Sequence, residues 1–246
     1  MTKIQKSILV VGIVLAVVGL GSASGQVNPL AGKIIALDAG HGGTSLGAQY
    51  PADSGYNGQI FEKDVNLAVV YTLKSKLEAD GATVVLTRKC DEALSNKGRA
   101  DIATAECKLL GRKCDVLVSV HHNGNVDPSH DGTLVIYNGK TDKKFATIMH
   151  DALISGLGLP DEGYLSGGYG ITIFGNFVSV LTESYYITNT NEAEANLAGA
   201  PSLVCDSNGD GVNDYSVLVG QRTEQEVDAL YSGIVNYFSA APQPTR

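Results

Sequence analysis

The sequence predicts an α/β fold, a three-layer sandwich in which helices flank a mostly parallel central sheet. Short apolar runs rich in Val, Ile and Leu alternate along the chain with longer segments whose apolar residues recur at helical spacing. The chain has 246 residues, of which 43% are hydrophobic, and this is enough for one well-packed core. We therefore expect one domain over residues 25–246, preceded by a separate N-terminal segment over residues 1–24.

Six apolar runs predict the strands of the sheet. They are short and rich in β-branched residues, and turn residues such as Asn138-Gly139 bound them. In chain order they cover residues 33–37, 83–87, 116–120, 133–137, 171–174 and 178–182.

Four longer segments predict helices. Between Val65 and Leu77 the apolar residues recur at helical spacing, and Asp80-Gly81 follows as a stop signal. The last segment shows the same i, i+3, i+4 pattern from Val227 to Phe238. The four predicted helices cover residues 62–79, 96–110, 143–155 and 221–238.

Residues 1–24 predict an export segment. Lys3 and Lys6 precede an apolar run over residues 8–20, and small residues follow it. The run is shorter than the roughly 20 residues of a membrane-spanning helix, which favours a cleaved signal peptide. No clean Ala-x-Ala site follows, so a retained N-terminal anchor is the alternative. In both cases we expect a secreted or periplasmic protein, or one on the exterior of the cell envelope.

The charge of the chain excludes one class of partner. The formal net charge is −8, and it becomes −10 once the charges of Lys3 and Lys6 are subtracted. Without a basic cluster in the sequence, nucleic acid is excluded as a partner. The acidity also argues against simple electrostatic adhesion to an anionic wall or membrane. We expect membrane contact only through a retained N-terminal anchor, and a monomeric protein.

Two histidines each follow a predicted strand. His41 comes after the run 34–37, and His121 comes after the run 116–120, while Glu62 opens the first predicted helix. In an open α/β sheet, functional side chains gather at the carboxyl ends of the strands. Two imidazoles and one carboxylate, with a fourth position open, are the ligand set of catalytic zinc. The sequence therefore predicts a zinc site at this edge.

A second carboxylate is expected beside this site. Glu183 follows the predicted strand 178–182, and beside a zinc-bound water it would serve as general base. Asp38 is expected to accept a hydrogen bond from an imidazole N–H. Alternatives exist for single residues: the Gly-His-Gly-Gly loop could cradle a phosphate, and Glu183 could cap a helix or pair with a cation. We assign His130 and His150 to the core or the surface.

Taken together, these motifs resemble the zinc-dependent N-acetylmuramoyl-L-alanine amidases of the amidase-3 type, which cleave bacterial peptidoglycan. The resemblance covers about residues 33–240. It rests on five short motifs that match the family pattern: Asp38-Ala39-Gly40-His41-Gly42-Gly43, Glu62-Lys63-Asp64, Val85-Leu86-Thr87-Arg88 followed by Arg99, Ser119-Val120-His121-His122-Asn123, and Val180-Leu181-Thr182-Glu183 followed by Asn189 and Glu192.

The resemblance implies that His41, Glu62 and His121 hold Zn²⁺ and that Glu183 activates water. The bond cut would be the amide between N-acetylmuramic acid and L-alanine, with peptidoglycan as the substrate. Three departures from the family pattern are Ala39 in place of Pro, His122 in place of a small residue, and Ser184-Tyr185-Tyr186 in place of Gly-Phe. The alternatives are another zinc amidohydrolase or peptidase on this scaffold, and a non-catalytic module that binds the envelope.

A second metal loop is predicted within an insertion at about residues 198–220. Oxygen-bearing side chains stand at alternate positions, Asp206, Asn208 and Asp210, and Asp214 follows Gly211. This spacing is typical of a calcium loop. The twelfth position is Val217 and not the closing Glu, so we expect a shortened or weaker Ca²⁺ site. The alternative is a turn rich in Asp, Asn and Gly that binds no ion.

The four cysteines predict two disulfides. An even number of cysteines in an exported chain favours disulfide bonds, with three connectivities open, whereas free buried cysteines are the alternative. The predicted topology favours one connectivity. Cys107 and Cys114 lie near each other between the second helix and the third strand, and Cys90 and Cys205 lie in loops at the opposite edge. We therefore expect 107–114 and 90–205.

Overall fold

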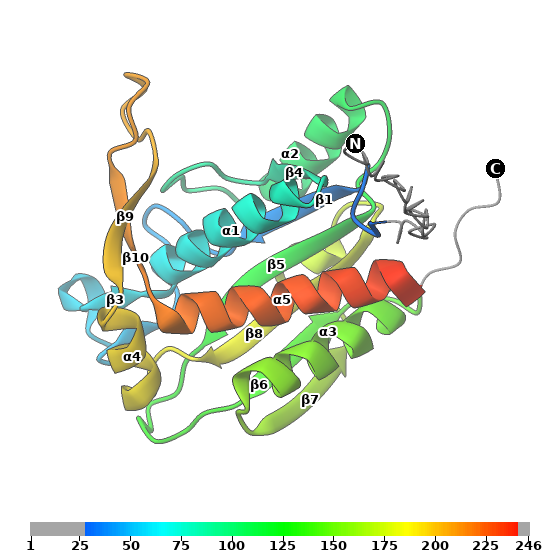
Figure 1. Cartoon of the computed structure of the whole chain (residues 1–246). Helices are drawn as coiled ribbons and strands as arrows, with labels where there is room; N and C mark the ends of the chain where they lie inside the picture. The colour runs from blue at the N-terminus through cyan, green and yellow to red at the C-terminus, as the bar shows by residue number, and fades with distance from the viewer. Residues whose placement is uncertain (1–27, 241–246) are drawn as a thin grey trace, which may run out of the picture.

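The computed structural model describes residues 28–240 of the chain (Figure 1). The predicted export segment lies outside the described residues. Within residues 28–240, no helix combines the length and the apolar character that crossing a membrane requires.

A six-stranded sheet forms the middle of the domain (Figure 1). The neighbouring strands β4, β1, β5 and β8 run parallel, whereas β6 runs antiparallel to β8 and β7 runs parallel to β6. The predicted mostly parallel sheet is therefore confirmed. In spatial order the strands are β4 (Thr83–Leu86), β1 (Ile34–Ala39), β5 (Val116–Asn123), β8 (Val178–Tyr186), β6 (Thr133–Tyr137) and β7 (Asp161–Ser166).

Helices cover both faces of the sheet, which completes the three layers. On one face lie α1 (Glu62–Ala79), α3 (Lys143–Leu157) and α5 (Gln221–Ala240); on the other lie α2 (Asn96–Leu109) and the 3-10 turn η2 (Gly170–Ile173). Successive side chains of β1 alternate between two buried clusters. Ile35 and Leu37 join the α1, α3 and α5 cluster, while Ile34 and Ala36 join the α2 cluster. This alternation explains why the run is apolar throughout.

Smaller elements surround one end of the sheet. They are the pair β2 (Gln49–Tyr50) and β3 (Ile60–Phe61), the turn η1 (Gly55–Asn57), the helix α4 (Thr190–Leu197), and the hairpin of β9 (Ala200–Cys205) and β10 (Tyr215–Val219). The hairpin occupies the region of the expected insertion. It is held to α1 by the Tyr215 hydroxyl, which donates a hydrogen bond to Asp64 at 2.6 Å.

Three predictions about the strands were wrong. Residues 171–174 do not form a strand, because Gly170 has a φ of +57° and the backbone turns into η2, which buries Ile171 and leaves Ile173 52% exposed. The third and sixth predicted strands are longer than expected, so that His121 and Glu183 lie inside β5 and β8 and not after them. The strand β7 was missed because its side chains are mostly exposed and show no apolar alternation.

Both expected disulfides are present. Cys90 in the loop after β4 is joined to Cys205 at the end of β9, with a Cα–Cα distance of 5.6 Å. Cys107 near the end of α2 is joined to Cys114 before β5, with a Cα–Cα distance of 5.4 Å. The first bond spans 115 residues of the sequence and the second spans 7. They therefore constrain the unfolded chain to different extents.

We expect that replacing Cys90 and Cys205 by Ser lowers the free energy of unfolding more than replacing Cys107 and Cys114. Closing a longer loop removes more entropy from the unfolded chain, and the loop lengths imply a difference of about 2–3 kcal/mol between the two double variants. Urea unfolding of both variants measures this difference. Equal losses in the two variants would contradict it.

Candidate metal centre

The fold brings His41, Glu62 and His121 together at the carboxyl-terminal edge of the parallel strands, which we call the active edge. His41 lies in the loop after β1, Glu62 is the first residue of α1, and His121 lies in β5. His41 Nε2 lies 3.1 Å from Glu62 Oε2, and His121 Nδ1 lies 2.9 Å from Glu62 Oε1. One ligand atom from each side chain falls within 4.8 Å of the others. Among residues 28–240 this is the one set of His, Cys, Asp and Glu side chains found that could hold a metal ion.

Glycine makes this convergence sterically feasible. A Cβ at Gly40 would lie 2.3 Å from the ring of His121, and a Cβ at Gly47 would lie 2.3 Å from Glu62 Oε2. Gly47 also has a φ of +74°, which side chains rarely adopt. His41 has a φ of +62°, and its Nδ1 is hydrogen-bonded to Ser45 Oγ at 2.9 Å, which leaves Nε2 directed at Glu62.

Glu62 is kept ionised although it is buried. Burial by itself would raise the pKa of this carboxyl group, but hydrogen bonds and charge from His121 and His41 outweigh burial and hold the pKa well below its usual range. Backbone N–H groups of Ala48 and His122 also donate to its two oxygens, at 2.8 and 3.1 Å. The position at the start of α1 adds the favourable field of the helix N-terminus.

Three buried side-chain atoms at the active edge have no hydrogen-bond partner among the described residues. They are Nε2 of His121, Oε2 of Glu183 and Nε of Arg99, whose other two nitrogens bind Asp38 and Asn96. Buried polar atoms in native proteins are nearly always satisfied, so each unsatisfied atom requires an explanation. Two imidazole nitrogens and one carboxylate are typical ligands of Zn²⁺. An unpaired carboxylate oxygen beside them is available to accept a hydrogen bond from a water molecule. The residues present therefore fit a catalytic metal.

Glu183 lies beside this set. It is the register partner of His121 across the β5–β8 pair. Burial raises the pKa of Glu183 well above its usual range, and the negative charge of Glu62 raises it further. A carboxyl group with a raised pKa near a metal site has the character of a general base.

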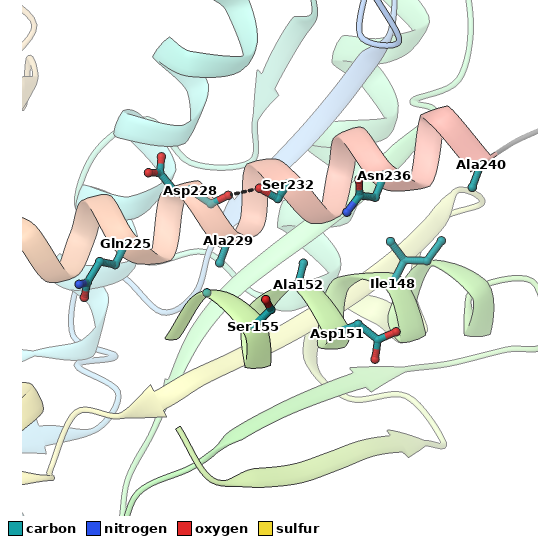
Figure 2. A pocket seen from close by; sticks show the side chains of 11 residues that line it. Ile148, Asp151, Ala152, Ser155, Gln225, Asp228, Ala229, Ser232, Asn236 and Ala240 are labelled. Atoms are coloured by element: carbon teal, nitrogen blue, oxygen red, sulfur yellow. Dashed lines mark hydrogen bonds between the residues drawn. The ribbon is translucent and has the colours of Figure 1, made fainter. Parts of the chain in front are cut away.

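These four residues line one cavity of about 510 Å³ at the active edge. Most of the other lining residues were not predicted from the sequence, because they lie outside the matched motifs. They include Ser95, Asn96, Gly124, Tyr169 and Gly170. Asn123 also lines the cavity and belongs to a matched motif, but no role was predicted for it. Tyr169 and Gly170 directly precede residues 171–174, which were predicted to be a strand but mostly form η2. A larger cavity of about 570 Å³ lies between α3 and α5 (Figure 2), and none of the four candidate residues lines it.

The expectation for Asp38 was wrong. Its carboxylate is fully buried and does not contact an imidazole; it accepts hydrogen bonds from Thr87, from Arg99 Nη1 at 2.8 Å and from Ser119 Oγ at 2.6 Å. The reason is that Asp38 lies inside β1 and is paired with Ser119, whereas the His41 ring lies beyond the end of the strand. Asp38 therefore stabilises the strand that leads into the metal-site loop.

The neighbouring Arg88 holds the backbone of this loop. It donates to the carbonyl oxygens of Ala39 at 2.7 Å, Gly40 at 3.1 Å and Lys63 at 2.7 Å. These bonds tie the loop that carries His41 to the first turn of the helix that carries Glu62. Arg88 belongs to a matched motif, but the sequence alone did not predict this role.

His122 is directed away from the metal set. Its Nδ1 is hydrogen-bonded to Asn66 Oδ1 at 2.7 Å and its Nε2 to Glu226 Oε2 at 2.9 Å, and its ring lies 4.3 Å from that of Tyr185. Both ring nitrogens are therefore engaged in the core between β5, α1 and α5.

His130 and His150 also lie apart from the metal set. His130 is hydrogen-bonded to Glu162 at 3.0 Å, and His150 to Asp161 at 2.8 Å. Both contacts agree with the core or surface positions expected for these residues.

The predicted calcium loop connects β9 and β10. The carboxylate of Asp206 accepts hydrogen bonds from backbone N–H groups of residues 208–211, and these bonds lower its pKa. Asp210 accepts from Val212 N–H, and Asp214 accepts from Ser207 N–H. These contacts form a turn, and Ca²⁺ binding by Asp206, Asn208, Asp210 and Asp214 stays a prediction.

Comparison with known proteins identifies the family of the chain. A family model described as N-acetylmuramoyl-L-alanine amidase (Amidase_3) matches residues 35–197. The chain belongs to this amidase family. Residues beyond 197, which form the hairpin and α5, lie outside the match.

Individual relatives and solved structures agree with this membership in the amidase family. An uncharacterized protein of Bacillus subtilis, YqiI, is 30% identical over 79% of this chain and 88% of its own length. The N-acetylmuramoyl-L-alanine amidase LytC of B. subtilis is 29% identical over 68% of this chain, which spans only 32% of LytC. The catalytic domain of CwlV, an N-acetylmuramoyl-L-alanine amidase from Paenibacillus polymyxa, superposes with a TM-score of 0.65 at 26% identity, covering 85% of this chain and 99% of that domain.

We expect that Asp38→Ala lowers the free energy of unfolding by about 3–5 kcal/mol, because it leaves the buried guanidinium of Arg99 without a counter-charge. The matched control is Asp101→Ala, which removes an exposed ion pair with Lys97 on the same helix and should cost less than about 1 kcal/mol. Urea unfolding of both variants measures the two losses. A loss for Asp38→Ala as small as that of the control would contradict the structural role.

Proposed function

We propose that the protein is a zinc-dependent hydrolase of peptidoglycan that cleaves the amide between N-acetylmuramic acid and L-alanine. The observation that carries the proposal is the convergence of His41, Glu62 and His121 with Glu183 beside them at one edge of the sheet. Membership in the amidase family supports the same reaction. We propose His41, Glu62 and His121 as the zinc ligands and Glu183 as the catalytic base.

When bound, Zn²⁺ supplies a Lewis acid that polarises the amide carbonyl and lowers the pKa of a water molecule. The residues of the chain transfer the proton and position the ligands. Glu183 takes a proton from the attacking water and then gives it to the amine of L-alanine as this leaves. Burial raises the pKa of Glu183, which favours its acceptance of the proton from water. Glu62 and the loop around His41 fix the positions of the ligands before substrate arrives.

We also propose that the domain acts outside the cytoplasm. The export segment predicted at residues 1–24 supports this location. The two disulfides support it as well, because such bonds form and persist in oxidising compartments.

The Glu183→Gln variant tests the role of Glu183. The amide side chain keeps the size of the carboxyl group but cannot accept a proton, so we expect kcat to fall by about 10²–10⁴-fold with zinc content and melting temperature unchanged. Glu194→Gln, which changes an exposed carboxylate of α4, is the matched control and should keep full activity. Full activity in Glu183→Gln would contradict the assignment.

Removal of the metal tests whether hydrolysis depends on zinc. We expect a chelator to abolish hydrolysis of purified peptidoglycan and to lower the melting temperature, and added Zn²⁺ to restore both. A ligand present at about 100 times its Kd stabilises the folded state by about 2.7 kcal/mol. Glu62→Gln should reduce the zinc-dependent shift in melting temperature, because the variant keeps the two imidazole ligands but not the carboxylate.

Mass analysis of the products distinguishes an amidase from a peptidase and from a protein without hydrolytic activity. Free stem peptides that begin with L-alanine support the proposed amidase. Fragments cut inside the stem peptide would point to a zinc peptidase on the same scaffold. Sacculi that stay intact under all metal conditions would point to a non-catalytic module and contradict the proposal.

A further inference from the structure

The charges of the domain are unevenly distributed. Of the 18 Lys and Arg residues, Lys3, Lys6 and Arg246 lie outside residues 28–240, which leaves 15 against 26 Asp and Glu. Seven of these 15 fall in three short segments, residues 28–33, 108–115 and 138–144, which contain only two acidic residues. The seven are Lys33, Lys108, Arg112, Lys113, Lys140, Lys143 and Lys144.

The three segments adjoin one another at the end of the sheet opposite the active edge, and we call them the basic edge. Arg112 donates to the carbonyl oxygen of Gly32 at 2.6 Å. Lys33 Nζ lies 5.0 Å from the ring of Phe238 near the end of α5, and Lys144 donates to the carbonyl oxygen of Ala240 at 2.9 Å. The last turn of α5 therefore links the segments. In Figure 1 the start of the described chain, the end of α2 and the end of α5 lie at this same end of the molecule.

Most acidic groups of this region are occupied by internal contacts, and the exception is the exposed carboxylate of Glu106 near the end of α2. Asp115 is paired with Arg112 at 2.7 Å, and its carboxylate also accepts from the Ile34 N–H at 2.7 Å. Asp142 is buried and accepts from the Gly139 N–H at 3.0 Å. Asp80, in the adjacent turn after α1, accepts a hydrogen bond from the Tyr231 hydroxyl.

Four of the cations are exposed and form no ion pair or side-chain hydrogen bond with the rest of the described chain: Lys108, Lys113, Lys140 and Lys143. Beside them, Leu109 is 82% exposed and Leu110 is 48% exposed. The basic edge thus presents unpaired positive charge together with apolar side chains.

Helix dipoles do not explain this arrangement. A cation at a helix C-terminus is favourable, which accounts for Lys108 at the end of α2 and for Lys144 at the end of α5. Lys143, however, begins α3, where the helix field disfavours a positive charge, and Lys140 lies just before it. A partner outside the described chain would account for both.

We propose that the basic edge docks on an anionic lipid bilayer and holds the active edge away from the membrane. The described chain begins at this edge, and the 27 residues that precede it include the apolar run 8–20, which enters a membrane in the retained-anchor alternative to a cleaved signal peptide. The remaining surface carries most of the acidic residues and would be repelled by an anionic bilayer. A net charge of −8 spread evenly over the surface would oppose such adhesion, but the charges of this domain are segregated.

The test uses the full chain, with its N-terminal segment, inserted into vesicles of phosphatidylcholine alone or of phosphatidylcholine mixed with phosphatidylglycerol. Hydroxyl-radical footprinting reads the oxidation of Leu109 and Leu110 at the basic edge, with Val126 and Val212, 80% and 65% exposed, as reporters elsewhere. We expect phosphatidylglycerol to reduce the oxidation of both leucines several-fold and to leave both valines unchanged. At about 1 M salt, where the screening length is about 3 Å, the protection should disappear.

Two variants distinguish docking through the basic edge from a general effect of the net charge of the protein. One replaces the unpaired edge cations, Lys108, Lys113, Lys140 and Lys143, by Gln. The control replaces four exposed amides around the other end of the sheet by the matching acids: Asn57→Asp, Gln59→Glu, Asn191→Asp and Gln221→Glu. Both variants lower the net charge by the same amount. We expect the first to abolish the protection of the leucines and the control to keep it. Equal protection in neutral vesicles, protection of the valines, no protection at all, or equal loss in both variants would overturn the proposal.

Discussion

The carboxylate of Glu62 is the point on which the candidate site depends. It is buried at the first turn of α1, between the imidazoles of His41 and His121, and it receives N–H groups from Ala48 and His122. A buried negative charge is costly unless several groups stabilise it together. His41 and Ala48 lie in the loop between β1 and β2, and His121 and His122 lie in β5, so stabilising this charge requires that this loop, β5 and the start of α1 meet.

The parallel sheet supplies the rest of the geometry. Neighbouring strands end at the same edge, so β1, β5 and β8 deliver His41, His121 and Glu183 to one place. Behind them, Asp38 and Arg99 form a buried ion pair, and Arg88 binds the carbonyl oxygens of the loop that carries His41. The reacting groups therefore rest on rigid elements, as a preorganised site requires.

Much of this arrangement could be predicted from the sequence, because strand runs and helical periodicity are local signals. The alternation of elements predicted the sheet, and the positions of His41, Glu62 and His121 at the ends or starts of elements predicted their convergence. Partner choice inside the core could not be predicted. The residues around Asp38 in the sequence are compatible with a contact to an imidazole and with a contact to Arg99. The register of β1 against β5 decides which of the two contacts forms.

Elements with weak apolar patterns were missed for a related reason. The exposed strand β7 carries no alternation, and the turn η2 begins at a glycine with positive φ that looks like any other glycine in the sequence. Charge segregation was also hidden, because the three basic segments lie far apart in the chain and meet only around the end of α5. Only tertiary structure reveals a property that is distributed in this way.

The most direct test of the account is the coordination of zinc in the loaded protein. X-ray absorption at the zinc edge, compared between the unchanged chain and Glu62→Gln, reports which atoms surround the ion. We expect two imidazole nitrogens and one carboxylate oxygen from the protein, with the oxygen contribution altered in the variant. Sulfur ligands, three imidazoles, or a spectrum that is the same in both proteins would contradict it.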